Sequence, residues 1–200
     1  MKRSQLIFTF TCLLWAFSIG LGLYLLMKHE LSPGKPAKPP VNWPKDSNLK
    51  LSTDKDTLVM FVHPQCPCTR ASLEQLTPLT KMENLAIQIL IFSPKIKPKD
   101  WSEKTCSDLN LSQKSVSMVP DYDGLEARRF QSKTSGQALL YDSKGRLIFT
   151  GGITGARGKT GNNPGLIELC SAIREHNNSG KVRETLVFGC SLLNTDSPNK

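Results

Sequence analysis

The chain opens with a long apolar run. Leu6–Met27 spans twenty-two residues without a charged side chain, and a helix that rises about 1.5 Å per residue would cover the roughly 30 Å hydrocarbon core of a bilayer. Basic residues flank the run on both sides, as they do in a secretory signal. Small residues at Ser18 and Gly20 offer weak cleavage sites, but the apolar run continues past them. We therefore expect residues 1–30 to form an uncleaved transmembrane anchor.

The basic residues around the apolar run bear on its orientation. Lys28 and the three lysines that follow it outnumber Lys2 and Arg3, and a simple count would place the C-terminal domain inside the cytoplasm. Long translocated domains respond little to charge, however, and a basic pair ahead of the first apolar segment is typical of a signal anchor. We expect a single-pass protein whose soluble domain lies outside the cytoplasm, facing the periplasm of a bacterium.

A proline-rich segment follows the anchor. Residues 31–47 contain five prolines, at positions 33, 36, 39, 40 and 44. Proline removes a backbone donor and favours an extended, semi-rigid chain. We expect this segment to be a linker that holds the folded domain, over residues 48–197, clear of the bilayer.

Strand-like and helix-like patterns alternate in residues 48–197. Asp56–His63 and Leu85–Phe92 are short apolar runs typical of buried strands, and Ala71–Met82 between them has leucines at helical spacing, with a kink expected at its proline. The later elements expected are short helices over Asp100–Leu109 and Leu125–Phe130, a hairpin of Gly136–Asp142 with Arg146–Thr150, and a helix over Leu166–Glu175. The order β-α-β, then β-β-α, predicts an α/β layered domain.

Composition and charge change this picture little. Apolar residues at 38% and charged residues at 22% describe a foldable chain. The formal net charge is +9, but six of the 26 basic residues lie before Asn48, and the remainder carries +5 from 20 basic and 15 acidic residues. That balance is ordinary, so we expect no nucleic-acid partner.

The candidate chemistry gathers where the first strand of the domain meets its first helix, in His63-Pro64-Gln65-Cys66-Pro67-Cys68-Thr69-Arg70. Pro67 suits the first position of a helix, which makes Cys66 the N-cap residue. A sulfur at an N-cap faces free backbone N–H groups and the positive end of the helix dipole, which favour the nucleophilic thiolate. Arg70 adds a nearby cation. A disulfide between Cys66 and Cys68 would close a small ring, and departure from relaxed geometry would make it oxidising or labile.

These features resemble the thioredoxin-like superfamily, which has the same β-α-β and β-β-α order and keeps a Cys-x-x-Cys pair where Cys66 and Cys68 stand. Three stretches look, more narrowly, like a membrane-anchored bacterial family labelled RedB: HPQCPCTRASLEQL, TSGQALLYDSKGRLIFTGGITGARG and VFGC. The similarity covers most of Asp56–Cys190. It implies a thioredoxin-like domain behind one N-terminal transmembrane helix, with a cysteine site and no cofactor.

The sequence departs from the thioredoxin pattern in two ways. Compared with Cys-x-x-Cys, the Cys-x-Cys spacing shifts the second sulfur by about 100° around the helix. The nucleophile is therefore either Cys66 or Cys68. Thioredoxins also place a cis-proline before the third strand, facing the cysteines, whereas the corresponding Lys133–Gln137 contains no proline. The resemblance therefore implies a changed peptide-docking edge.

The other four cysteines each have a simpler interpretation. Cys12 lies in the apolar run and acts there as a small apolar residue. Cys106 and Cys170 lie in helix-like segments, where core packing is common for a free cysteine and a structural disulfide is the alternative in an oxidising compartment. Cys190 follows Phe188-Gly189 near the C-terminus. The sequence favours equally a packed thiol and a resolving partner for the cysteine site.

The glycine-rich stretch Gly151–Gly161 contains Gly-Lys-Thr behind a predicted strand. Five residues separate Gly152 from Gly158 where a phosphate loop needs four, so we do not expect nucleotide binding. The resemblance implies instead that the loop lies near the cysteine site, where Arg157 and Lys159 would lend positive charge.

Three functions fit the cysteine motif. The first is a membrane-anchored thiol-disulfide oxidoreductase that exchanges with an unidentified protein thiol or disulfide. The second is a copper-binding assembly factor, because His63, Cys66 and Cys68 form a His-x-x-Cys-x-Cys pattern suited to Cu(I) or Zn(II). The third is a tethered, non-catalytic scaffold. We favour the first, for which the candidate site residues are Cys66, Pro67, Cys68, Arg70 and Cys190.

Overall fold

The computed structural model describes residues 3–102, 115–175 and 180–193. The chain divides into two compact units, residues 1–32 and residues 33–200. The first unit is a single helix, α1 (Arg3–Leu31), none of whose side chains is buried. It is long and apolar enough to cross a membrane, and a signal sequence near an N-terminus would have the same character. The expected apolar helix is therefore confirmed, and its length and composition fit an anchor or a signal.

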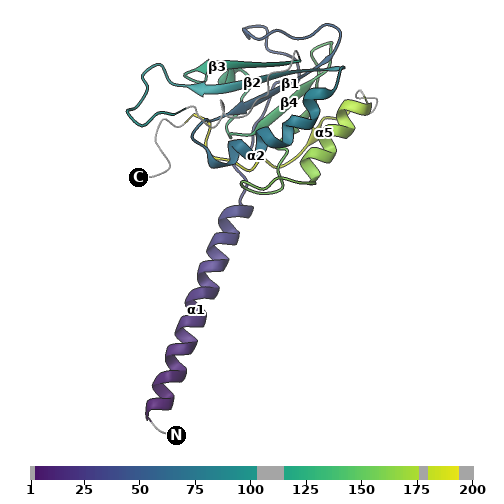
Figure 1. The fold of residues 1–200 in the computed structure, drawn as a ribbon. Coiled ribbons are helices and arrows are strands. Elements are labelled where there is room, and N and C mark those ends of the chain that lie inside the picture. The colour runs from purple at the N-terminus through teal and green to yellow at the C-terminus, as the bar shows by residue number, and fades with distance from the viewer. Residues whose placement is uncertain (1–2, 103–114, 176–179, 194–200) are drawn as a thin grey trace. The chain divides into compact units, whose positions relative to one another are not determined.

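The second unit is built on a six-stranded mixed sheet in the order β3-β2-β1-β4-β5-β6 (Figure 1). The strands are β1 (Asp56–Val62), β2 (Leu85–Ser93), β3 (Val116–Tyr122), β4 (Gln137–Tyr141), β5 (Leu147–Gly151) and β6 (Arg183–Glu184). β1, β2 and β3 run parallel to one another, and β4 is antiparallel to both of its neighbours, β1 and β5. β1 lies in the middle of the sheet, so the segment that follows it emerges at the centre of one sheet end.

Helices cover the sheet. They are α2 (Pro67–Leu76), the 3-10 helix η1 (Thr77–Lys81), α4 (Leu125–Arg129) and α5 (Pro164–Glu175). Figure 1 shows α2 and α5 on the same side of the sheet, and leucines of both helices pack in one core cluster with β1. The β-α-β unit (β1, α2, β2) and the β-β-α unit (β4, β5, α5) are those expected from the sequence. This arrangement is the thioredoxin-like α/β fold.

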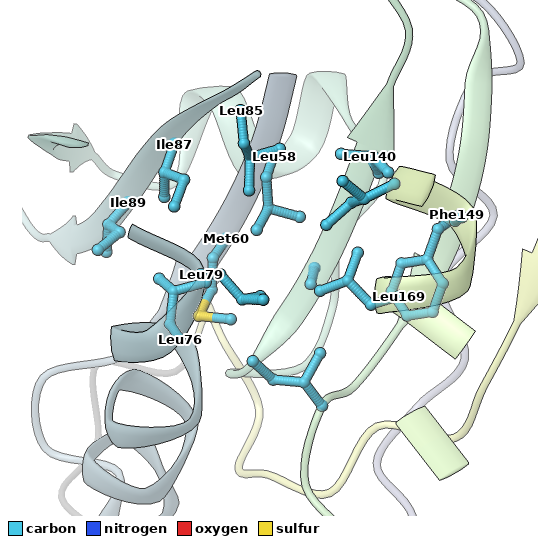
Figure 2. Close-up of a cluster of buried hydrophobic side chains, with 14 of the residues drawn as sticks. Leu58, Met60, Leu76, Leu79, Leu85, Ile87, Ile89, Leu140, Phe149 and Leu169 are labelled. Carbon is cyan, nitrogen blue, oxygen red and sulfur yellow. The ribbon is translucent and has the colours of Figure 1, made fainter. Parts of the chain in front are cut away.

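The alternation of side chains along β1 divides the core between the two faces of the sheet. Leu58 and Met60 point toward the α2 and α5 side, where they meet Leu76 of α2 and Leu169 of α5 (Figure 2). Val59 and Phe61, on the other face, pack with Phe130 and Tyr141. Because all seven residues of β1 are buried, each large side chain contributes about 1.5–3 kcal/mol on leaving water. The strand that leads to the cysteine motif is thus rigidly held.

Some boundaries differ from the sequence-based expectation. The helix expected over Ala71–Met82 begins at Pro67 and gives way after Leu76 to η1, in whose first turn Pro78 lies. β3 was not expected, because it is a half-exposed edge strand that contains a proline. Most of the helix expected over Asp100–Leu109 falls outside the described residues.

The proline-rich segment is part of the folded unit. The compact unit begins at Pro33 rather than at residue 48. The N–H of Gly34 donates to the carbonyl of Val187 at 2.8 Å, and that of Trp43 donates to Gly145 at 2.7 Å. The Trp43 ring also packs edge-on against Phe130, with centroids 5.1 Å apart. The segment expected to be a spacer over residues 31–47 therefore lies along the domain from Pro33 onward.

Candidate functional site

Cys66 lies at the N-cap of α2, directly after β1. Its backbone is extended, with φ −80° and ψ 122°, and Pro67 occupies the first turn. Two hydrogen bonds close the turn: Cys66 N–H donates to the His63 carbonyl at 3.0 Å, and the Thr69 hydroxyl donates to the same carbonyl at 2.7 Å. The Cys66 side chain makes no capping hydrogen bond to the helix. Its sulfur is therefore available to groups from other parts of the domain.

The partner of Cys66 comes from near the other end of the chain. The sulfurs of Cys66 and Cys190 lie 2.9 Å apart, and the main-chain N–H of Cys190 donates to the Cys66 sulfur at 3.3 Å. Both residues are free cysteines. A disulfide needs a sulfur separation of about 2.05 Å, so a movement of about 1 Å would bring these two sulfurs into bonding distance. Of the two roles open to Cys190, this contact favours the resolving partner.

The hydrogen bonds among the three sulfurs shift their pKa values in opposite directions. The pKa of Cys66 lies well below its ordinary value, mainly because the Cys190 side chain donates to it and also because Cys68 does, and these contacts outweigh burial. The pKa of Cys190 is raised, first because its thiol would lose the hydrogen bond to Cys66 on ionising. Of the three sulfurs, Cys66 is therefore the one whose surroundings favour the thiolate.

Cys68 is the third member of the sulfur cluster. A hydrogen bond with Cys190 lowers its pKa, but its hydrogen bond to Cys66, burial and the negative charge of Cys66 together outweigh that contact, and the pKa is raised. Only 5% of its surface is exposed. Of the two nucleophiles left open by the sequence, the electrostatics favour Cys66.

Residues 187–192, here called the C-terminal strap, hold Cys190 in place. The strap runs antiparallel to the segment before β4: Ser135 N–H donates to the Cys190 carbonyl, and Leu192 N–H donates to the Lys133 carbonyl, both at 2.9 Å. Thr134 and Ser191 form the bridge between these two bonds. The strap thus occupies the edge formed by the proline-free Lys133–Gln137 segment. No side-chain pattern in the sequence indicated this pairing, because main-chain groups make it.

A cation reaches the site from the glycine-rich loop. Arg157 Nη1 donates to the Gly189 carbonyl in the strap at 2.8 Å, and after the hydrogen bond with Cys190 its positive charge is a second, smaller contribution that opposes the rise in the pKa of Cys68. The loop is tied to α2, since Gln75 exchanges two hydrogen bonds with the main chain of Gly161, at 2.6 and 3.0 Å. This places part of the loop beside the cysteines, and Lys159 in the same loop is exposed.

Arg70 takes a different position from the one expected. Its side chain is 72% exposed and its Nε pairs with Glu74 at 2.8 Å, one turn further along α2. Arg70 therefore forms a surface ion pair with Glu74, whereas the charge of Arg157 acts on Cys68. The helical spacing of Arg70 and Glu74, four residues apart, was the signal in the sequence for this surface pair.

His63 is packed as an aromatic residue. It is 5% exposed, and its ring stacks on Phe92 with centroids 5.3 Å apart and meets Trp101 edge-on. Its Nδ1 accepts a hydrogen bond from the Gln65 N–H at 3.2 Å. Within the described part of the chain, no group of three or more His, Cys, Asp or Glu residues is arranged to hold a metal ion. The His63 ring is therefore held by its aromatic neighbours.

Two of the remaining cysteines, Cys12 and Cys170, fall within the described residues. Cys12 is an exposed free cysteine on α1, and Cys170 is a half-buried free cysteine on α5 that packs against the core between the helices and the sheet. Cys106 lies outside the described residues. Core packing of Cys106, and its alternative, a structural disulfide, both stay predictions.

Comparisons with known proteins agree on the fold. No protein-family model matches the chain, and no curated protein matches it. A solved structure of an uncharacterized conserved protein from Geobacillus kaustophilus has a TM-score of 0.57 and 16% identity, over 81% of this chain and 92% of that one. A hypothetical protein from Sinorhizobium meliloti has a TM-score of 0.55 and 18% identity, over 81% and 94%.

A secreted disulfide oxidoreductase from Mycobacterium tuberculosis has a TM-score of 0.41 and 15% identity, over 62% of this chain and 84% of that one. At such identities a likeness shows the fold and no more. The strand order of the unit from Pro33 onward and the cysteine that caps α2 are those of a thioredoxin-like fold. None of these matches supports the narrower RedB-type resemblance.

Proposed function

We propose that this chain is a membrane-anchored thiol-disulfide oxidoreductase in which Cys66 is the attacking sulfur and Cys190 the resolving one. The observation that carries the proposal is the 2.9 Å contact between the two sulfurs at the N-terminus of α2. A thiolate is the nucleophile in disulfide exchange, and Cys66 has the lowered pKa in the cluster. A resolving thiol must lie close to the attacking one, as Cys190 does.

The exchange balances as follows. The Cys66 thiolate attacks one sulfur of a partner disulfide, the partner S–S bond breaks, and the leaving thiolate takes up a proton. Cys190 gives up its proton and attacks the Cys66 sulfur, which releases the second partner thiol. The partner gains two electrons and two protons, and the chain ends with a Cys66–Cys190 disulfide. In reverse, the same steps would pass the disulfide to a partner dithiol.

The contact between the two sulfurs also sets the order of these steps. The pKa of Cys190 is raised mainly by its hydrogen bond to Cys66. When Cys66 forms a mixed disulfide it loses its negative charge and becomes a weak acceptor, so the pKa of Cys190 returns toward its ordinary value. Cys190 thus becomes a better nucleophile only after Cys66 has reacted. Cys68 would serve as an alternative partner for Cys66, through the short Cys-x-Cys ring.

The proposal includes a location. The apolar helix α1 fits an anchor, and disulfide chemistry is favoured outside the cytoplasm. The stretches that resemble the RedB-type family add to this proposal. A phosphatase reporter that is active only outside the cytoplasm, fused after Leu193, should be active in cells. Activity of a cytoplasm-specific reporter at the same position would contradict the orientation.

Thiol counting tests the redox proposal. The full chain in detergent is equilibrated over a series of glutathione potentials, its intact mass is measured, and each disulfide is mapped in peptides. We expect a reversible loss of two hydrogens that maps to Cys66–Cys190 and disappears in Cys66→Ser. Cys170→Ser, which changes a cysteine away from the cluster, should keep the bridge. If Cys66 stays reduced at every potential, the proposal is wrong.

A further inference from the structure

The surroundings of Cys66 favour its thiolate form, but the residue is almost completely shielded from solvent. Its pKa is lowered, yet only 2% of its surface is exposed. The nearest sulfur and a main-chain N–H both belong to Cys190 in the C-terminal strap. Exchange requires an outside sulfur to reach the attacking thiolate. While the strap is in this position, a partner therefore has no approach to Cys66 from the strap side.

The strap lies flat against the segment before β4. A Cβ added to Gly189 would stand 2.0 Å from the Ser135 carbonyl oxygen, so only glycine permits this approach. The strap is anchored at its two ends by buried side chains, Phe188 at 9% and Leu192 at 1% exposure. Cys190 and Ser191 between these anchors are half-buried. Side-chain packing therefore fixes the two ends of the strap, whereas hydrogen bonds hold its less buried middle.

Arg157 contacts this middle section from a separate element. Its Nη1 donates to the Gly189 carbonyl, the residue directly before Cys190. Its Nε is buried and has no hydrogen-bond partner among the described residues, so the guanidinium is withdrawn from water at the strap. A hydrogen bond from a charged donor is stronger than one between neutral groups. Arg157 thus stabilises the position of Cys190 without touching either sulfur of the Cys66–Cys190 pair.

We propose that Arg157 is a positioning residue that holds the C-terminal strap closed over Cys66, and so sets how readily an outside thiol or disulfide reaches that sulfur. This inference rests on the proposed function only in taking Cys66 as the reactive thiol. An outside reagent reacts through the fraction of molecules in which the strap is open. Loss of the Arg157 contact raises that fraction, and at the same time it weakens the closure that forms the Cys66–Cys190 disulfide.

The test measures access in the reduced protein, without any exchange reaction. The reduced full chain in detergent is treated with iodoacetamide at alkaline pH, where the open form of Cys66 is ionised, and the rate at Cys66 is followed by peptide fragmentation. Arg157→Gln should raise this rate about tenfold, the equilibrium effect of losing a charged hydrogen bond. Arg157→Lys should restore most of the protection. Arg174→Gln, an exposed arginine on α5, is the charge-matched control and should leave the rate unchanged.

Cys170 in the same samples separates opening of the strap from general loosening. The alkylation rate of Cys170 should not change in Arg157→Gln. Equal rates at Cys66 in wild type and Arg157→Gln, or parallel increases at Cys66 and Cys170, would overturn the positioning role.

The variant Gly189→Ala tests the strap independently of Arg157. Its added Cβ displaces the strap while Arg157 is intact, so the alkylation rate of Cys66 should rise in this variant as well. If Cys66 reacts in none of the variants, the proposed function falls with the inference; if it reacts equally in all of them, only the inference falls.

Discussion

The hydroxyl of Ser135 accepts a hydrogen bond from the main-chain N–H of His63 at 2.9 Å. The Thr69 hydroxyl lies 3.1 Å from the same oxygen, and the Ser135 N–H donates to the Cys190 carbonyl. Ser135 therefore links the turn that carries Cys66 to the strap that carries Cys190. One small residue therefore positions both segments relative to each other.

Replacement of Ser135 tests this link. Ser135→Ala removes the hydroxyl from a residue that is 1% exposed, and removal of one partner from a buried hydrogen bond costs about 1–3 kcal/mol. We expect that loss in the free energy of unfolding, measured by urea denaturation of the full chain. Ser117→Ala, at an exposed edge position of β3, is the matched control. Equal stability of the two variants would show that the Ser135 hydroxyl does not hold the turn.

Removal of the Cys190 thiol should raise the pKa of Cys66. The Cys190 side chain is the largest cause of the lowered pKa, and in Cys190→Ala it is absent. In wild type we expect alkylation of Cys66 to persist as the pH falls through neutrality. In the variant the rate should decline with falling pH from a higher midpoint, toward the ordinary thiol value of about 8.5. The measurement is the pH dependence of iodoacetamide labelling at Cys66.

Two further variants sharpen that result. Cys190→Ser keeps a hydroxyl donor, so its shift should be smaller than that of Cys190→Ala. Cys68→Ser tests the second cause of the lowered pKa. A Cys66 midpoint that is the same in wild type and Cys190→Ala would mean that Cys190 does not stabilise the thiolate.

The fold was predictable from the sequence where burial leaves a strong pattern. β1 and β2 are continuous apolar runs because they lie inside the sheet. The helix α5 has apolar residues at helical spacing because one face of this helix packs on the sheet. β3 gave no such pattern, because several of its side chains face solvent at the sheet edge. The long helix α1 was evident for the opposite reason, since it is apolar on every side.

The candidate site was only half predictable. The position of Cys66 followed from the proline after it, because proline marks the first turn of a helix. The approach of Cys190 joins residues 124 positions apart, and it depends on main-chain bonds of Ser135 and Leu192 that leave no trace in residue types. The role of Arg157 was expected only through the resemblance, whereas Arg70 was chosen for its nearness in sequence and pairs with Glu74 instead.

The end of α2 should be sensitive to loss of packing. Leu76 is fully buried in the cluster between α2 and the sheet, and Figure 2 shows it near Met60 of β1. Leu76→Ala removes three carbon atoms from a close-packed site, and such changes cost about 2–5 kcal/mol. Urea denaturation should show this loss. Ile96→Ala, at a position 89% exposed, should stay within about 0.5 kcal/mol of wild type, and an equal loss in both would contradict the assigned core.

Trp43 should hold the proline-rich segment on the domain. Its ring lies edge-on to Phe130 and Tyr141, with centroids 5.1 and 5.2 Å away. Each aromatic pair contributes about 0.5–1.5 kcal/mol beyond simple burial, so Trp43→Ala should cost about 1–3 kcal/mol for these two contacts, in addition to the burial that is lost with the ring. The variant should also free the Lys45–Asp46 bond for trypsin, because cleavage requires the backbone to leave the domain. Val41→Ala, at an exposed site in the same segment, is the control and should remain as resistant as wild type. Rapid cleavage of wild type after Lys45 would mean that the segment is a free spacer, as the prolines alone predict.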